Sequence, residues 1–144
     1  MTMVFELSLG FVMIILAMML HLGATILIVR TVRPLEVLIK SSPYVFIAAT
    51  LMLTNLIFFV THLIGVALWA LVYLYLNLAA DFSSAFYSAF IMNTTLGLGL
   101  INAEIGTRLL APLTASSGIM MIGWSTAVYI YVVQSYLPHI ARHD

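Results

Sequence analysis

Residues 81–99, DFSSAFYSAFIMNTTLGLG, interrupt the long apolar runs that make up most of this 144-residue chain. Asp81 is a residue type that favours the N-cap of a helix, and Ser83 or Ser84 can share that role. The stretch from there to about Asn93 predicts a helix too short to cross a bilayer, which takes about 20 residues. A Thr-Thr-Leu-Gly-Leu-Gly string follows it. This segment therefore predicts a short helix and a glycine-containing loop between two membrane spans.

Long uncharged runs on both sides of this segment establish the class of the protein. Charged residues are 7% of the chain and apolar residues 64%, against about 25% and about 45–50% in soluble domains. No charge occurs in the 23 residues between Glu6 and Arg30, the 40 between Lys40 and Asp81, or the 33 after Arg108. Uncharged apolar runs of about 18 or more residues are typical of transmembrane helices. We therefore expect an all-α integral membrane protein.

The spans are expected at residues 4–29, 43–80 and 107–137. The second is long enough for either one tilted helix or a hairpin of two short spans. One helix is favoured, because the middle of the run has none of the residues that a tight turn prefers, and Gly65 is the nearest. The predicted organisation is an N-terminal span with its linker, residues 1–42, and a second domain, residues 43–144.

Basic residues follow the first span directly and predict the orientation. Arg30, Arg33 and Lys40 are three of the five basic residues in the chain. The positive-inside rule places their loop in the cytoplasm. The N-terminus is then outside, and after three crossings the C-terminus is cytoplasmic.

The sequence lacks the residue patterns that are typical of several function classes. The net charge is zero and basic residues do not cluster, which argues against nucleic acid as a partner. The chain has no cysteine, and no paired carboxylates or nucleophile–base pair indicates an enzyme or a small-molecule substrate. His21 and His62 lie within spans, where a haem site and a hydrogen-bonded contact between helices are the alternatives; nothing else favours haem.

The glycine-containing loop has a specific physical interpretation. Non-helical backbone at membrane depth must be buried in protein or line a water-filled path. Gly97 and Gly99 can adopt backbone conformations that let successive carbonyls point the same way. A stack of such carbonyls, with the Thr95 hydroxyl below it, can replace the hydration shell of an ion.

Residues 81–99 resemble the pore helix and selectivity filter of the potassium-channel pore family, small bacterial pore-only and two-pore-domain-like channels included. The resemblance extends to residues 68–73 before this segment and to residues 108–110 and 123–127 after it, and it covers roughly residues 60–135. It implies a homotetramer in the lipid bilayer of the plasma membrane. It also implies passive conduction of monovalent cations, K⁺ first among them, with no enzymatic activity and no catalytic cofactor.

The resemblance also assigns the filter. Thr95 would bind the innermost cation through its hydroxyl and carbonyl. Residues 96–98 would offer their carbonyls above it, and Gly99 would close the outer end. Potassium or another monovalent cation would then lie at Thr95, Leu96, Gly97 and Leu98, with Gly99 outside them. Asp81 and Thr94 would support the filter from behind.

Around the filter, Leu100 and Glu104 would form the outer mouth. Glu104 would concentrate cations there, or alternatively pair with Arg108 one helical turn later. The family has tyrosine and aspartate where this chain has Leu98 and Leu100, which removes two braces of the filter. A weakly selective channel, a non-selective channel and a non-conducting subunit that keeps the pore fold are therefore the alternatives.

Small residues in the last span have two interpretations. Gly118 and Gly123 are candidate hinges of a gate, or they simply allow close helix packing. Thr114, Ser116 and Ser117 make the same region polar, which suits an aqueous cavity or a packed neighbour better than lipid.

Overall fold

The structure is a computed structural model that describes residues 3–34, 42–96 and 109–140, with side chains to residue 136. These residues form four helices and no strand: α1 (Met3–Val32), α2 (Pro43–Tyr75), α3 (Phe82–Asn93) and α4 (Leu110–Ile140). Three segments, α1, α2 and Leu110–Tyr136 of α4, are long and apolar enough to cross a membrane. The prediction of an all-α, multi-pass membrane protein is confirmed at this level.

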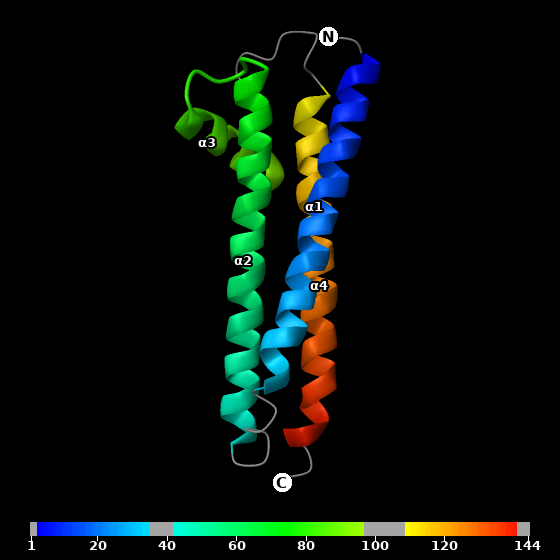
Figure 1. The fold of residues 1–144 in the computed structure, drawn as a ribbon, viewed down its shortest axis with the longest axis vertical. Helices are drawn as coiled ribbons and strands as arrows, with labels where there is room; N and C mark the ends of the chain where they lie inside the picture. The colour runs from blue at the N-terminus through cyan, green and yellow to red at the C-terminus, as the bar shows by residue number, and fades with distance from the viewer. Residues whose placement is uncertain (1–2, 35–41, 97–108, 141–144) are drawn as a thin grey trace.

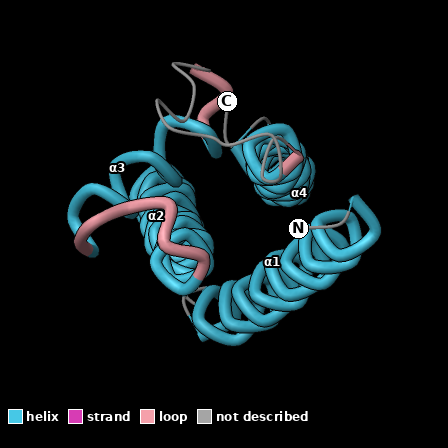
Figure 2. The backbone as a smooth tube through the Cα atoms, turned by 90° about the horizontal axis from the view of Figure 1, so that it is seen from above, coloured by secondary structure: helices cyan, strands magenta, loops and turns pink. Residues whose placement is uncertain are grey.

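The long helices form an elongated three-helix bundle (Figure 1). Seen from above in Figure 2, they occupy three corners, and α3 lies beside α2. The end of α2, the short helix α3 and the start of α4 all lie toward the end of the bundle where the N-terminus lies. The short helix therefore lies at one end of the bundle rather than across its middle.

The second span is a single helix, as predicted. Pro43 occupies its first turn, where the missing N–H costs nothing. The helix ends at Tyr75, five residues before the predicted limit, because Asn77 adopts a left-handed conformation with φ 55°. Asparagine is one of the few residues that enters this region readily, so the apolar character of the next residues does not extend the helix.

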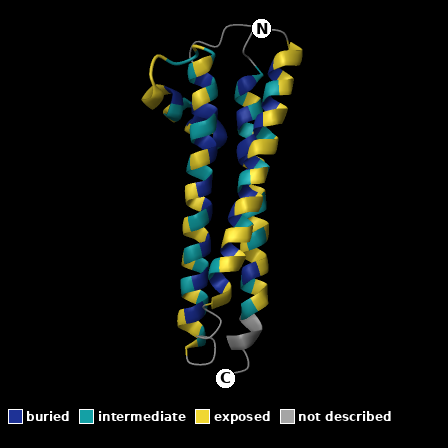
Figure 3. Ribbon diagram, viewed as in Figure 1, coloured by how far each residue is buried: buried dark blue, intermediate teal, exposed yellow. Residues whose placement is uncertain are grey.

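One face of α1 is buried and the opposite face is exposed (Figure 3). Its buried residues recur every three or four positions, which matches the helical repeat of 3.6: Glu6, Gly10, Met13, Ala17, His21, Ala24, Ile28 and Val32. Large exposed residues such as Phe11, Leu16 and Met19 cover the other side. An exposed face of this composition is suited to lipid.

Small residues on α3 allow it to pack closely on its neighbours. Ala85 and Ala89 are fully buried and share a core with Trp69 and Tyr73 of α2 and Leu110 of α4. Because the alanine side chain is a single methyl group, the axis of α3 can approach those of α2 and α4 closely. This packing positions the end of α3, which precedes the glycine-containing loop.

Candidate functional site

The start of α3 is capped by the residue that the sequence indicated. The Asp81 carboxylate accepts hydrogen bonds from the backbone N–H and the hydroxyl of Ser84, both at 2.9 Å. These bonds lower the pKa of Asp81, so the cap stabilises α3 at neutral pH and is lost as the pH falls through that lowered pKa. Asp81 thus lies at the opposite end of α3 from Thr94, and its predicted role as a filter support remains a prediction.

The other end of α3 closes with a Schellman motif. The N–H of Thr95 donates to the Met92 carbonyl at 3.0 Å, and the N–H of Leu96 donates to the Ile91 carbonyl at 3.2 Å. Thr95 carries the left-handed conformation of this motif, with φ 63°. Glycine usually occupies that position, and a β-branched residue there is strained by roughly 1–2 kcal/mol. The helix therefore ends abruptly at the residue predicted to begin the filter.

Thr94 and Thr95 use their polar groups differently. The Thr94 hydroxyl donates back to the Phe90 carbonyl at 3.0 Å, within its own helix. The carbonyl oxygens of Thr95 and Leu96 accept no hydrogen bond among the described residues, and both residues are exposed. Gly97, Leu98, Gly99, Leu100 and Glu104, the other predicted filter and outer-mouth residues, lie outside the described residues.

Asn93, the last residue of α3, packs closely against the backbone of α4. Asn93 is 3% exposed, and its side-chain amide donates to the Thr114 carbonyl at 3.5 Å. A methyl group added at Gly118 would overlap the Asn93 carbonyl oxygen and come within 2.7 Å of the carbonyl carbon. Only glycine permits this approach. Gly118, a candidate hinge, therefore has a packing role in this structure, whereas Gly123 is exposed with nothing within 4 Å of such a methyl group.

A buried hydrogen bond links α2 to the same place. The Tyr73 hydroxyl and Thr114 Oγ1 are 2.8 Å apart, and both side chains are fully buried. Thr114 donates its single proton to the Leu110 carbonyl at 2.8 Å, so Tyr73 is the donor to Thr114. We call Tyr73, Asn93, Thr114 and Gly118 the α3 junction, because they join three helices where α3 ends. Sequence reasoning missed Tyr73 and Asn93, which carry no local signal.

A carboxylate from α1 caps α4. Glu6 is 3% exposed, and its Oε2 accepts the backbone N–H of Leu109 at 3.0 Å. The first amides of a helix have no partner within it, and a negative charge there is favourable. A single acidic residue at the start of an apolar span was the available signal for this contact, which the sequence interpretation missed. Glu6 fixes the start of the helix that follows the predicted filter.

One exposed face of α4 differs in kind from the exposed face of α1. Its residues recur at intervals of three or four, and most are small or polar: Pro112, Ser116, Ile119, Gly123, Thr126, Ile130 and Gln134. Hydroxyl, amide and glycine positions are poorly suited to lipid but suit contact with another helix or with water. This face extends along α4 on both sides of the α3 junction.

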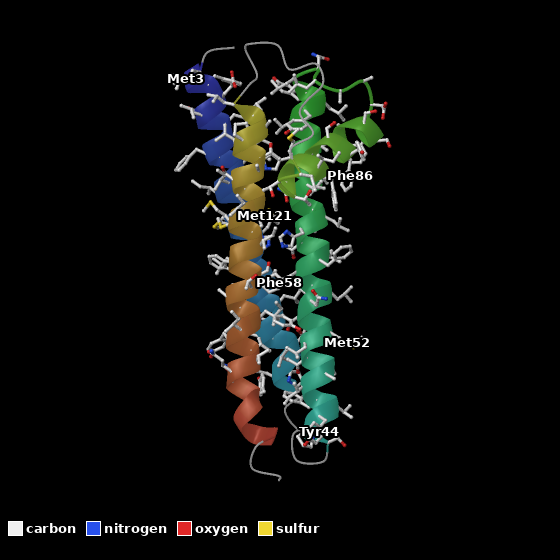
Figure 4. All side chains as sticks on the ribbon, turned by 180° about the vertical axis from the view of Figure 1, so that it is seen from behind. Met3, Tyr44, Met52, Phe58, Phe86 and Met121 are labelled. Carbon is white, nitrogen blue, oxygen red and sulfur yellow. The ribbon has the colours of Figure 1, made fainter. Side chains whose placement is uncertain are left out.

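The two histidines within the spans contact each other directly. The rings of His21 and His62 are 5.0 Å apart at 75°, and His62 Nε2 lies 3.2 Å from the Ser125 hydroxyl. Phe58 stacks on His21 with ring centroids 5.8 Å apart, in the layer of side chains between the helices (Figure 4). This is the arrangement of a polar contact between helices. Among the described residues, no group of three or more His, Cys, Asp or Glu side chains could hold a metal ion.

No protein-family model, curated protein or solved structure matches this chain. The candidate site therefore rests on the residues and contacts of the chain itself.

Proposed function

We propose that this chain is one subunit of a homotetrameric channel that conducts monovalent cations passively through a filter of backbone carbonyls. Potassium is the proposed ion, bound at Thr95, Leu96, Gly97 and Leu98, with Gly99 closing the outer end. In this proposal α2 and α4 are the outer and inner helices, α3 is the pore helix, and α1 is an additional helix facing lipid.

The position of the end of α3 carries the proposal. Asn93 is packed on Gly118, eight residues after the start of α4. At 1.5 Å per residue, Gly118 lies about 12 Å from that start. The chain that begins at Thr94 therefore has to cover this distance to reach Leu109, and the Thr-Thr-Leu-Gly-Leu-Gly string is the first part of that stretch of sequence. A short helix that ends at depth, followed by a glycine-containing segment that leads back, is the arrangement that a carbonyl filter needs.

The end of α3 is held in a way that suits a filter. In the α3 junction, Asn93 is tied to α4 by its hydrogen bond to Thr114 and by its contact with Gly118. The Tyr73–Thr114 hydrogen bond ties that part of α4 to α2 in turn. The Schellman motif turns the chain away from the helix and leaves the Thr95 and Leu96 carbonyls without hydrogen bonds among the described residues. Carbonyls that are fixed in position but not hydrogen-bonded can bind a dehydrated cation without reorganising.

The polar face of α4 supports assembly of several copies. Three membrane helices cannot enclose a water-filled path by themselves, so a path must lie between copies. The exposed side chains of Ser116, Thr126 and Gln134 would then face that path or a neighbouring subunit, where polar groups can be satisfied. One loop per chain and the proposed four-fold arrangement require four identical chains.

Ion flux through reconstituted protein tests the proposal. The purified chain is placed in liposomes, and the fluxes of potassium, sodium and a large organic cation are compared. We expect potassium to exceed sodium and the organic cation to be excluded. Gly97→Asp, which puts a carboxylate in the filter, should abolish the flux. The matched control is Asn77→Asp, which adds the same charge at an exposed turn at the same end of the bundle and should leave the flux unchanged.

Other outcomes separate the alternatives. Equal potassium and sodium fluxes, still lost in Gly97→Asp, would replace the selective channel with a weakly selective or non-selective one. The mass of the detergent-solubilised complex should be four times the 15.9 kDa of one chain. A tetramer that passes no ion in tight vesicles would overturn conduction and favour a non-conducting subunit, and a monomer would overturn the pore.

A further inference from the structure

A cavity of about 710 Å³ lies between α1 and α4, toward the end of α1. Its upper end is bounded by Trp124 of α4, whose indole N–H donates to the Thr25 hydroxyl of α1 at 3.0 Å. Its lower end reaches Arg33, directly after α1, and Ser135 of α4. The volume is within the usual range of about 300–1,000 Å³ for ligand pockets.

The cavity has apolar walls and polar groups at one end. Its walls are the aliphatic side chains of Ile28 and Val32 on one side and Val128 and Val132 on the other. From Thr25 to Arg33 there are eight residues, or about 12 Å along a helix. This length approaches half of the 30 Å hydrocarbon thickness of a bilayer, which is roughly the depth of one leaflet.

The charged side chains described at the lower end of the cavity are basic. Arg33 lines the cavity, and Arg30 is exposed one turn earlier. No acidic side chain is among the described residues that line the cavity. By contrast, none of the described residues that line the apolar groove between α1 and α2 is charged. A cation at the edge of an apolar cavity in a membrane helix favours a ligand with an anionic head and an apolar tail.

We propose that this cavity binds an anionic phospholipid of the adjacent leaflet. The phosphate lies against the Arg33 guanidinium, which can donate two parallel hydrogen bonds to it, and the Ser135 hydroxyl lies at the same end. One acyl chain lies between the valine walls and ends at Trp124. The proposal concerns the α1–α4 contact alone and is independent of whether the chain conducts ions.

The two tryptophans of the chain make a direct test available. Trp124 lines the cavity, whereas Trp69 is 1% exposed in the core beside α3. In a Trp69→Phe background, fluorescence reports on Trp124 alone. The protein is reconstituted in phosphatidylcholine vesicles containing a small fraction of phosphatidylglycerol with brominated acyl chains, and a second series contains brominated phosphatidylcholine instead. Bromine quenches a tryptophan only on contact, so quenching measures occupancy next to Trp124.

We expect brominated phosphatidylglycerol to quench Trp124 saturably and several-fold more strongly than brominated phosphatidylcholine at the same mole fraction. Arg33→Gln should remove this preference. Arg30→Gln is the matched control, because it removes the same charge from the same end of α1 without touching the cavity, and the preference should persist. Ala127→Phe, which narrows the cavity, should reduce quenching by both lipids.

Three results would overturn the proposal. Equal quenching by the two lipids would mean ordinary lipid contact without selection for charge. Equal loss of preference in Arg30→Gln and Arg33→Gln would mean attraction by the basic end of α1 as a whole. Absence of quenching by either lipid would mean that another copy of the chain covers the cavity.

Discussion

Replacing Gly118 with alanine tests the α3 junction most directly. The added methyl group would overlap the backbone carbonyl of Asn93, which belongs to the end of α3 and cannot rotate away as a side chain could. Overpacking of this kind costs about 1–3 kcal/mol. Displacing Asn93 would also weaken its hydrogen bond to Thr114, worth about 0.5–1.5 kcal/mol. Alanine returns about 0.5–1 kcal/mol of helix propensity, so the net destabilisation is about 0.5–4 kcal/mol.

Gly123→Ala is the matched control, five residues further along the same helix. Nothing lies within 4 Å of a methyl group there, so only the propensity term of about 0.5–1 kcal/mol remains, and it is stabilising. Because both variants share this propensity term, they should differ by the sum of the overpacking and hydrogen-bond terms, about 1.5–4.5 kcal/mol. This corresponds to a roughly 12- to 1,600-fold difference in the unfolding equilibrium constant.

Reversible unfolding in mixed micelles, followed by far-ultraviolet circular dichroism, measures this difference. Equal stability of the two variants, or a Gly118→Ala protein as stable as the wild type, would refute the close approach of α3 to α4. Ion flux through the same variants in liposomes separates packing from gating. A stable Gly123→Ala protein with reduced flux would identify Gly123 as a hinge, whereas unchanged flux would leave it as a site of helix contact.

Five further substitutions test other features in the same unfolding assay. Glu6→Ala should cost about 0.5–2 kcal/mol, because it removes the acceptor at the start of α4; Glu6→Gln keeps an oxygen acceptor and should cost less, and the reverse order would exclude capping. Thr114→Val leaves the buried Tyr73 hydroxyl without a partner and should cost about 1–3 kcal/mol. Tyr73→Phe should cost less, since Thr114 still donates to Leu110; equal costs would contradict the assigned donor. Thr95→Gly should stabilise the fold by roughly 1–2 kcal/mol through relief of the left-handed conformation. It should also lower potassium flux, because it removes a hydroxyl from the proposed filter, and unchanged flux would count against that role.

Most of the helices could be predicted from the sequence, and the errors have local causes. The uncharged runs located the three long helices, and the absence of turn residues near Gly65 correctly favoured one helix for α2. The predicted end at residue 80 was wrong because apolar composition does not report the backbone conformation of Asn77. The Asp81 cap was anticipated because an N-cap is a contact between residues three apart.

The candidate site was only partly accessible from the sequence. The sequence predicted that the Thr-Thr-Leu-Gly-Leu-Gly string follows a short helix, and Thr95 and Leu96 do follow the end of α3 directly. The filter itself stays a prediction. The α3 junction was missed, because Tyr73 and Thr114 are separated by 41 positions and no local pattern indicates that their side chains meet. Gly118 was noticed, but hinge and packing remained alternatives until its distance from Asn93 was known.

The sequence by itself determined the class of this protein: the positions of its apolar helices, the short helix after Asp81, and the loop that suggests a filter. These properties follow from residues near one another in the chain, where hydropathy and capping act. The tertiary structure alone decided that Glu6 caps α4 across 103 positions, that α3 ends against Gly118, and that α1 and α4 enclose a cavity ending at Arg33. Contacts of this kind depend on how each helix is rotated about its axis and where it crosses its neighbours. Those two quantities are set by the packing of all four helices together.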